Sequence, residues 1–254
     1  MTAAAIHPAA PARRYGSSRI GSVIRLYFTN PMTIAVTPFI VLASIFVLNL
    51  AIWVIVVVSS PGNTNFAEGF SYSGASAWIF FYMAVVAIQA MNNTFRLALG
   101  YGATRRDFYL GSALVFVAMS VVFTAVITIL GLLEEVTDGW GLQGRMFTPV
   151  YFGDNWGVRI AVILCLFLFF TFTGSAFGAV FVRWGRNGLL IFGGILLAIV
   201  VAIGLAIALL DAWGPFGSWL DANAPLGLAL WSLVPSAVFG VAGFFILRGA
   251  TPKS

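Results

Sequence analysis

The chain has 254 residues but few charged side chains and few of the residues that catalysis and metal binding most often use. Charged residues make up 8% of it, and it has one cysteine, Cys165, one histidine, His7, and one lysine, Lys253. A single cysteine excludes a disulfide framework and a cysteine-ligated metal cluster. Because His7 lies near the N-terminus, the rest of the chain has no imidazole for a zinc site or a haem. It also has none to pair with Ser175, so the sequence Gly174-Ser175 does not predict a rhomboid-type Ser-His protease.

The same scarcity argues against an enzyme, and no catalytic residue is assigned. Glu134 and Glu135 resemble the paired acids of an intramembrane metalloprotease class, but that pattern needs an arginine where Gly139 stands. We expect these acids, with Asp138, to form a solvated rim. A phosphate-binding loop needs a lysine after its glycines, and Lys253 in the C-terminal tail cannot supply it, so this chain does not bind ATP in that way.

What the chain does contain is six long apolar runs, each without a charged interior. Each has about the 20 residues that a helix needs to cross a bilayer. A charge at the centre of such a helix costs about 2.5 to 3.5 kcal/mol on insertion scales, which explains why the runs exclude charges. The runs cover residues 33–58, 73–91, 110–133, 158–182, 189–210 and 226–247. They predict an all-α integral membrane protein with six transmembrane helices.

The charged residues divide between alternate connections. Eleven of the thirteen basic residues belong to the N-terminal segment, the second and fourth loops and the tail, and seven of the eight acids to the first, third and fifth loops. Basic loops stay in the cytoplasm, so both termini are predicted to be cytoplasmic. The basic residues are Arg13, Arg14, Arg19, Arg25, Arg96, Arg105, Arg106, Arg183, Arg186, Arg248 and Lys253; the acids are Glu68, Glu134, Glu135, Asp138, Asp154, Asp211 and Asp221.

The net charge of +5 therefore reports orientation in the membrane and does not predict nucleic-acid binding. Residues 1–18 lack the apolar core of a signal peptide and are predicted to be a disordered cytoplasmic tail. Residues 19–250 are predicted to form a single six-helix domain, since the connections leave no room for a soluble module.

An amphipathic helix is predicted just before the first apolar run. From Arg19 to Phe28 the apolar residues recur at helical spacing, while Arg19 and Arg25 occupy other faces. Such a helix lies in the inner interface of the membrane. It is either a basic anchor that orients the first span or a mechanical element that contacts a partner. Its apolar residues are Ile20, Val23, Ile24, Tyr27 and Phe28.

The second loop, residues 92–109, is predicted to be cytoplasmic and is the most informative segment. Residues 94–99 are predicted to form a short helix that Gly100 ends in a left-handed turn. Thr104 and Asp107 resemble a capping box, which would begin the third span. The loop should project Phe95, Leu97, Leu99 and Tyr101 beside arginines, as a protein docking surface does, although a plain return to the membrane remains the alternative.

At this loop the sequence FRLALGYGATRRDFYLG resembles the ABC-2-type permeases of bacterial ABC exporters. The resemblance extends to the topology and implies that the loop is a coupling helix in a cleft of a separate ATP-binding subunit. It also implies that residues 19–28 are an elbow helix. The coupling residues would be Phe95, Arg96, Leu97, Leu99, Tyr101, Thr104, Arg105, Arg106 and Asp107.

The resemblance implies a multi-pass protein of the bacterial plasma membrane that works as the permease subunit of an exporter. Two ATP-binding subunits, which bind the ATP and Mg²⁺, would join this chain and a second permease subunit, identical or not. The charge-free spans favour a hydrophobic or amphipathic substrate, such as a drug, lipid or peptide. No cofactor or metal is expected in this chain.

An autonomous secondary transporter, a channel or a membrane scaffold without an ATPase is the alternative. Neutral polar residues within the runs are mainly expected to pack helices, or else to line a weakly polar path. The candidate path residues are Asn49, Gln89, Thr171, Thr173 and Ser175. Gly174 and Gly178 form a GxxxG motif that permits close helix approach, with a specific role in dimerisation as the less favoured interpretation.

The last outer loop, residues 211–225, is rich in aromatic residues. Trp213, Phe216 and Trp219 are therefore expected to dip into the outer interface of the membrane. The resemblance implies that this segment belongs to an outer gate, and a plain interfacial anchor is the other interpretation.

Overall fold

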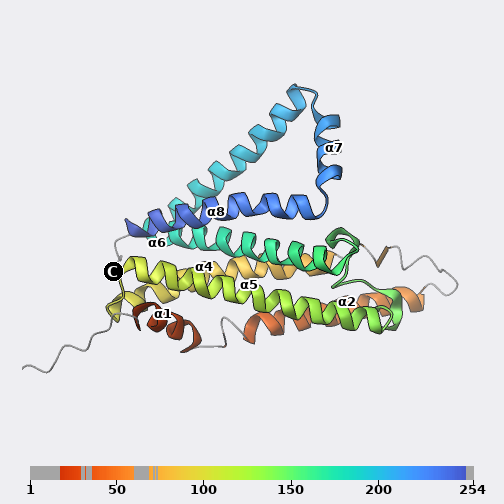
Figure 1. Ribbon diagram of the computed structural model, residues 1–254, viewed down its shortest axis with the longest axis horizontal. Coiled ribbons are helices and arrows are strands. Elements are labelled where there is room, and N and C mark those ends of the chain that lie inside the picture. The colour runs from red at the N-terminus through yellow and green to blue at the C-terminus, as the bar shows by residue number, and fades with distance from the viewer. Residues whose placement is uncertain are drawn as a thin grey trace, which may run out of the picture.

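The computed structural model describes residues 18–29, 32, 36–59, 69–70, 72 and 74–249, and in these the regular structure is entirely helical (Figure 1). Five helices are long and apolar enough to cross a membrane: α2 (Thr37–Ser59), α4 (Ala77–Gly100), α5 (Arg105–Val136), α6 (Trp156–Leu209) and α8 (Leu226–Arg248). These helices confirm the all-α membrane class. Arg13, Arg14, Glu68, Lys253 and residues 1–17 of the predicted tail lie outside the described residues.

The shorter elements lie at the ends of the long helices. They are α1 (Ser18–Thr29), η2 (Gly74–Ser76), η3 (Gly139–Gln143), η4 (Val150–Phe152) and α7 (Trp213–Asn223). The turn from α4 to α5, the C-terminal end of α8 and α1 lie at one end of the bundle, while η3 and η4 lie at the other (Figure 1).

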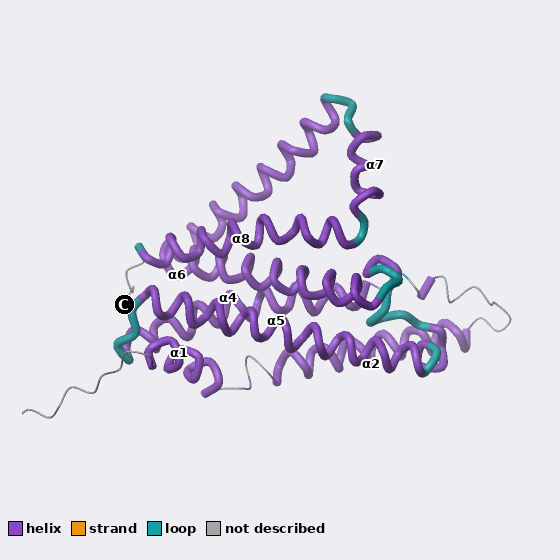
Figure 2. The backbone as a smooth tube through the Cα atoms, in the orientation of Figure 1, coloured by secondary structure: helices purple, strands orange, loops and turns teal. Residues whose placement is uncertain are grey.

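The fourth and fifth apolar runs are joined in α6, which is 54 residues long. Gly185 interrupts it with φ 71° and ψ −158°, a conformation that residues with a side chain rarely adopt. The tube in Figure 2 shows the consequence: the chain turns sharply and the second part of α6 leaves the bundle. The fourth and fifth runs are thus separate helical segments, but a single glycine divides them where a loop over residues 183–188 was expected.

The first part of α6 forms the centre of the bundle. The helix packs against α4, α5 and α8, and Gly174 and Gly178 lie directly against α4. A Cβ atom at Gly174 would lie 2.2 Å from the carbonyl oxygen of Ala84, and one at Gly178 would lie 2.8 Å from Cβ of Met91. The GxxxG motif is therefore used within the chain, against α4, and this contact accounts for it without a second copy.

The second part of α6, together with α7, forms a frame outside the bundle. Figure 1 shows α7 crossing from the far end of α6 to the start of α8. No residue of α7 is buried, and most of the apolar side chains between Leu190 and Leu210 are exposed. So many exposed apolar side chains on one helix require an apolar surrounding, which the hydrocarbon of a membrane supplies.

Helix α1 confirms the predicted amphipathic helix and packs against α5 and α4. Val23 and Tyr27 are buried, and a Cβ atom at Gly111 of α5 would lie 2.8 Å from Cγ1 of Val23. The Tyr27 hydroxyl donates to Oγ of Ser112 over 2.6 Å. Burial raises the pKa of Tyr27 well above its ordinary range. Ile20 and Ile24 are half-buried, and Phe28 is exposed.

Candidate functional site

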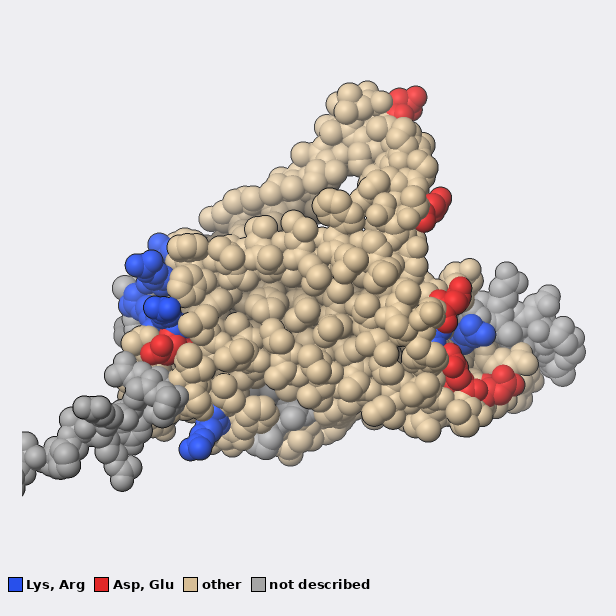
Figure 3. Space-filling view, in the orientation of Figure 1, with Lys and Arg blue, Asp and Glu red and all other residues tan. Residues whose placement is uncertain are grey.

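Charged side chains gather at opposite ends of the folded chain, as the sequence predicted (Figure 3). Blue atoms cluster at the end that holds α1 and the C-terminal end of α8, where a single red patch interrupts them, and the other red atoms lie at the far end and on the frame. We call these the basic end and the acidic end. The candidate functional surface is the turn from α4 to α5, at the basic end.

This turn is built by the way α4 stops. The amide of Ala103 donates to Ala98 O and that of Gly102 to Leu99 O, each over 3.0 Å. Gly102 has φ +80°, and together these features form a Schellman motif with its glycine in the left-handed position. The prediction of a separate short helix ended by Gly100 is therefore wrong. Residues 94–99 are the last turns of α4, and Gly102 turns the chain.

Helix α5 begins immediately after the turn. Thr104 caps it, with its Oγ1 accepting the amide of Asp107 over 3.1 Å, which confirms the cap that the sequence predicted. Asp107 is the acidic residue of the first turn of α5, where the positive end of the helix dipole favours an anion. The two caps leave only residues 101–104 between the helices, so this turn is short and its ends are fixed.

Four side chains in or beside the turn are exposed. Leu97 is 54% exposed and Tyr101 80% exposed, and Arg96 and Arg106 are exposed beside them. Phe95 does not join them, because only 1% of it is exposed and its ring packs edge-on against Phe108 at 5.3 Å. The expectation that Phe95 projects as a docking residue is corrected: the helical period of α4 turns position 95 inward. Leu99 is half-buried against the core.

Two arginines of this end hold α8 in place. Nη1 of Arg105 donates to Arg248 O over 2.9 Å, and Nη1 of Arg183 donates to Ile246 O over 3.3 Å. Carbonyls in the last turn of a helix have no partner within the helix, and they carry its negative partial charge. Arg105 from α5 and Arg183 from α6 therefore cap α8 from two sides. Both arginines were counted only among the basic residues of the loops, and their contacts with α8 were not predicted from the sequence.

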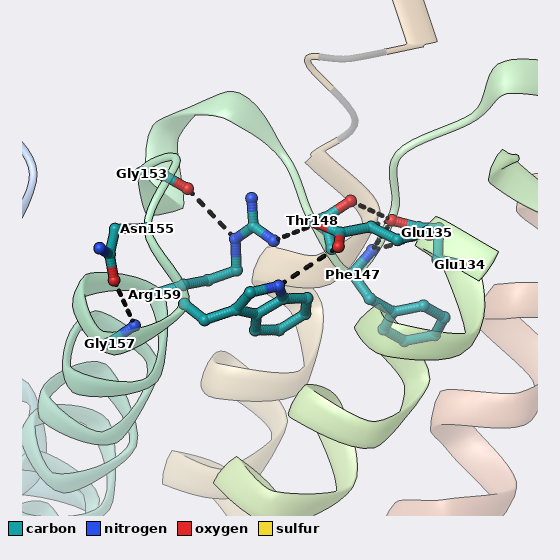
Figure 4. A network of polar contacts seen from close by, with 9 residues as sticks. Glu134, Glu135, Phe147, Thr148, Gly153, Asn155, Gly157 and Arg159 are labelled. Carbon is teal, nitrogen blue, oxygen red and sulfur yellow. Dashed lines mark hydrogen bonds and ion pairs between the residues drawn. The ribbon is translucent and has the colours of Figure 1, made fainter.

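The acidic end is organised by Glu134, which is 1% exposed (Figure 4). Its carboxylate accepts the amides of Met146, Phe147 and Thr148 at 2.8 to 3.1 Å. The Thr148 hydroxyl donates to it at 2.6 Å and the Trp140 indole at 3.2 Å. The prediction that Glu134 belongs to a solvated rim is wrong. Glu134 lies in the last turn of α5, a helix of 32 residues, and the loop that follows α5 covers its side chain. Asp138 is exposed, as expected.

Glu135 and Arg159 form an ion pair beside this loop. Nη1 of Arg159 lies 2.8 Å from Oε1 of Glu135, and Nε of Arg159 donates to Gly153 O over 3.1 Å. The guanidinium also lies over the ring of Trp156, at 4.6 Å from its centroid. Arg159 is buried, and these contacts compensate its charge. The pair joins the end of α5 to the start of α6.

The loop anchored by Glu134 supports α2. Trp53 of α2 packs flat on Gly144, where a Cβ atom would lie 2.2 Å from the indole ring. Phe46 of α2 lies 4.7 Å from Trp140 and 5.6 Å from Phe147, between ring centroids. Through these contacts the loop joins α2 to the bundle. The role of Glu134 gave no sequence signal, since a buried and an exposed acid at a helix end have the same local pattern.

The predicted path residues do not converge. Gln89 is exposed, Asn49 of α2 is half-buried, and Thr171 donates to Phe167 O of its own helix over 2.6 Å. Ser175 is buried beside the hydroxyl of Tyr109, which also donates to Gly240 O and so joins α5, α6 and α8. Thr173 is half-buried. Neither the groove between α5 and α8 nor that beside η4 is lined by any of the five residues.

The predicted outer aromatic residues lie on α7. The rings of Trp213 and Phe216 are 6.3 Å apart, and Phe216 stacks on Trp219 at 6.3 Å. Trp219 lies 6.1 Å from Trp231 of α8. These contacts form an aromatic row along the frame, exposed at Trp213 and Trp219. Helix α7 runs across the direction of the long helices of the bundle (Figure 1), and this orientation agrees with an interfacial element.

Within the described residues no group of three or more His, Cys, Asp and Glu side chains could hold a metal ion. No protein-family model matches the chain, and no curated protein or solved structure is detectably similar to it.

Proposed function

We propose that this chain is the membrane-spanning permease subunit of an ATP-driven exporter of the ABC-2 type in a bacterial plasma membrane. The observation that carries the proposal is the α4–α5 turn, which presents exposed Leu97 and Tyr101 between Arg96 and Arg106 at the basic end. Apolar and aromatic side chains that project from a rigid turn are typical of a docking surface. A loop that only reverses the chain gains nothing from an exposed tyrosine.

The rigidity of the turn supports a mechanical role. Its two helices are capped by the Schellman motif at Gly102 and by Thr104, so a force applied at Tyr101 acts on α4 and α5 directly. Helix α1 packs on the same end of α5 through Val23 and Tyr27. In the proposed mechanism the ATP-binding subunits close on ATP and carry this end with them. The two states must then differ in their contacts with the partner.

The proposed assembly has two ATP-binding subunits and a second permease subunit, with six membrane spans in this chain. The kink at Gly185 supports six, because it divides α6 into two apolar segments. The substrate class is hydrophobic or amphipathic, since the apolar runs have no charge in their interiors. Transport is outward, as the resemblance to the exporter permeases implies.

The double substitution Leu97→Glu and Tyr101→Glu tests the docking surface. We expect it to reduce the amount of ATP-hydrolysing subunit that co-purifies with the tagged chain by at least about tenfold, because it places charges at two apolar anchors of the interface. The measurement is ATPase activity per mole of chain, after mild detergent extraction from the native membrane.

Val136→Glu is the matched control. Val136 is 85% exposed and lies at the acidic end, so the same kind of change there should leave co-purification unaltered. Phe95 is left untouched because its burial makes any polar substitution a test of folding. Retention of the ATPase by the double variant would refute the docking assignment. A wild-type chain that carries no ATPase at all would favour an autonomous transporter.

A further inference from the structure

A groove opens at the basic end between the first turns of α5 and the last turns of α8, with a volume of about 670 Å³. Arg105 and Arg106 contribute from α5 and Arg248 from α8, so three guanidinium groups line it. The rest of the lining is largely apolar and includes Leu110, Phe244 and Phe245. A cluster of positive charge thus borders an apolar surface.

The charge of this groove is not neutralised within the described part of the chain. The one ion pair found there joins Arg159 to Glu135, at the opposite end. Arg105 uses Nη1 to bond Arg248 O over 2.9 Å, which fixes the distance between the two helices, and the side chains of Arg106 and Arg248 are exposed. The nearest acid in sequence, Asp107, does not line the groove.

The apolar part of the groove is exposed on the outer surface of the bundle. Leu110 and Phe245 are exposed, and both lie on the membrane side of the arginines, Leu110 further along α5 and Phe245 before the end of α8. A ligand that fills this groove must present an anion to the arginines and a hydrocarbon to Leu110 and Phe245. A free phosphate satisfies only the first requirement.

We propose that this groove binds an anionic glycerophospholipid of the leaflet that meets the basic end. Its phosphate would accept hydrogen bonds from Arg106 and Arg248, and an acyl chain would lie over Leu110 and Phe245. Basic pockets between transmembrane helices at the cytoplasmic surface bind anionic headgroups in this way, and guanidinium groups match the geometry of phosphate oxygens. The proposal depends on the basic end lying at a membrane surface and not on any ATPase partner.

Lipid titration of the purified full-length chain in an uncharged detergent tests the proposal. Phosphatidylglycerol and phosphatidylcholine with identical acyl chains are compared by native mass spectrometry, with glycerol phosphate as the soluble anion. Since each of two basic side chains near a membrane surface contributes about fivefold, we expect phosphatidylglycerol to bind about 30-fold more tightly than phosphatidylcholine. Glycerol phosphate should bind far more weakly than either.

The double variant Arg106→Ala and Arg248→Ala should lose most of this preference, and Arg106→Lys with Arg248→Lys should keep part of it. Arg186→Ala is the matched control, because Arg186 is exposed at the same end but does not line the groove. Phe245→Ser should weaken phosphatidylglycerol and leave glycerol phosphate unchanged. Equal binding of the two lipids, an unchanged preference in the alanine variant, or tight binding of glycerol phosphate would each overturn the proposal.

Discussion

Replacing Glu134 with alanine is expected to lower the melting temperature of the purified protein by about 10 °C. The substitution leaves the buried amides of Met146, Phe147 and Thr148 without their acceptor. Each unpaired buried donor costs about 1 to 3 kcal/mol, and about 1 kcal/mol corresponds to 2 to 4 °C in a protein of this size. Tryptophan fluorescence during heating in detergent measures the change. The melting temperature of Glu134→Gln should lie between those of the wild type and Glu134→Ala. Its amide oxygen can still accept hydrogen bonds, but its NH₂ group faces other donors.

A local measurement separates this effect from general destabilisation. Arg145 lies exposed in the anchored loop, with its amide bonded to Phe70 O over 3.4 Å. Trypsin should cut after Arg145 much faster in Glu134→Ala than in the wild type, because the loop and α2 loosen together. Asp154→Asn is the control, since Asp154 is exposed at the same acidic end. Equal melting and equal cleavage of Glu134→Ala and Asp154→Asn would show that Glu134 does not anchor the loop.

Gly174→Ala is expected to destabilise the bundle by about 3 kcal/mol, at the upper end of overpacking costs. Its Cβ atom would lie 2.2 Å from Ala84 O and 2.8 Å from Cα of Ala84. These are backbone atoms, so α4 as a whole must move away from α6. For the same reason Ala84→Gly should not rescue the variant. The midpoint of unfolding in a denaturing detergent measures the loss.

Gly204→Ala is the control for Gly174→Ala. Gly204 lies in the second part of α6, where an added Cβ atom meets nothing within 4 Å. Alanine there should be neutral, or stabilising by up to about 1 kcal/mol, because alanine has the higher helix propensity. If Gly174→Ala instead kept its stability and changed the number of chains in the particle, the motif would serve a contact between copies.

The length of the apolar runs and the absence of charge within them were enough to predict the long helices. The positions of the helix ends were predicted less accurately. Thr104 was recognised as a cap because its hydroxyl acts on a neighbour three residues away. Gly100 and Gly102 are both local candidates for the left-handed position, and the choice depends on how far α4 continues. Because α4 continues to Gly100, Phe95 lies on the side of the helix that faces the core.

Contacts between distant segments could not be predicted from one sequence. Arg105 and Arg248 are separated by 143 positions, and the carboxylate of Glu134 is satisfied by a loop whose path depends on positive φ at Asp138, Trp140 and Gln143. The contact of Gly174 with Ala84 depends on how α4 packs against α6, which the local sequence does not determine. Charge and apolar pattern report which environment a residue prefers, whereas these contacts depend on the tertiary arrangement that brings the partners together.

The proposed orientation supports the docking surface, the lipid groove and the count of six spans, and cysteine labelling tests it most directly. Single cysteines at Asp154, Arg186 and Asp221, all exposed, are introduced into a Cys165→Ala background and treated in intact cells with a membrane-impermeant maleimide. We predict labelling at positions 154 and 221, and labelling at 186 only after the membrane is opened. Labelling of position 186 in intact cells, with 154 and 221 protected, would contradict the account.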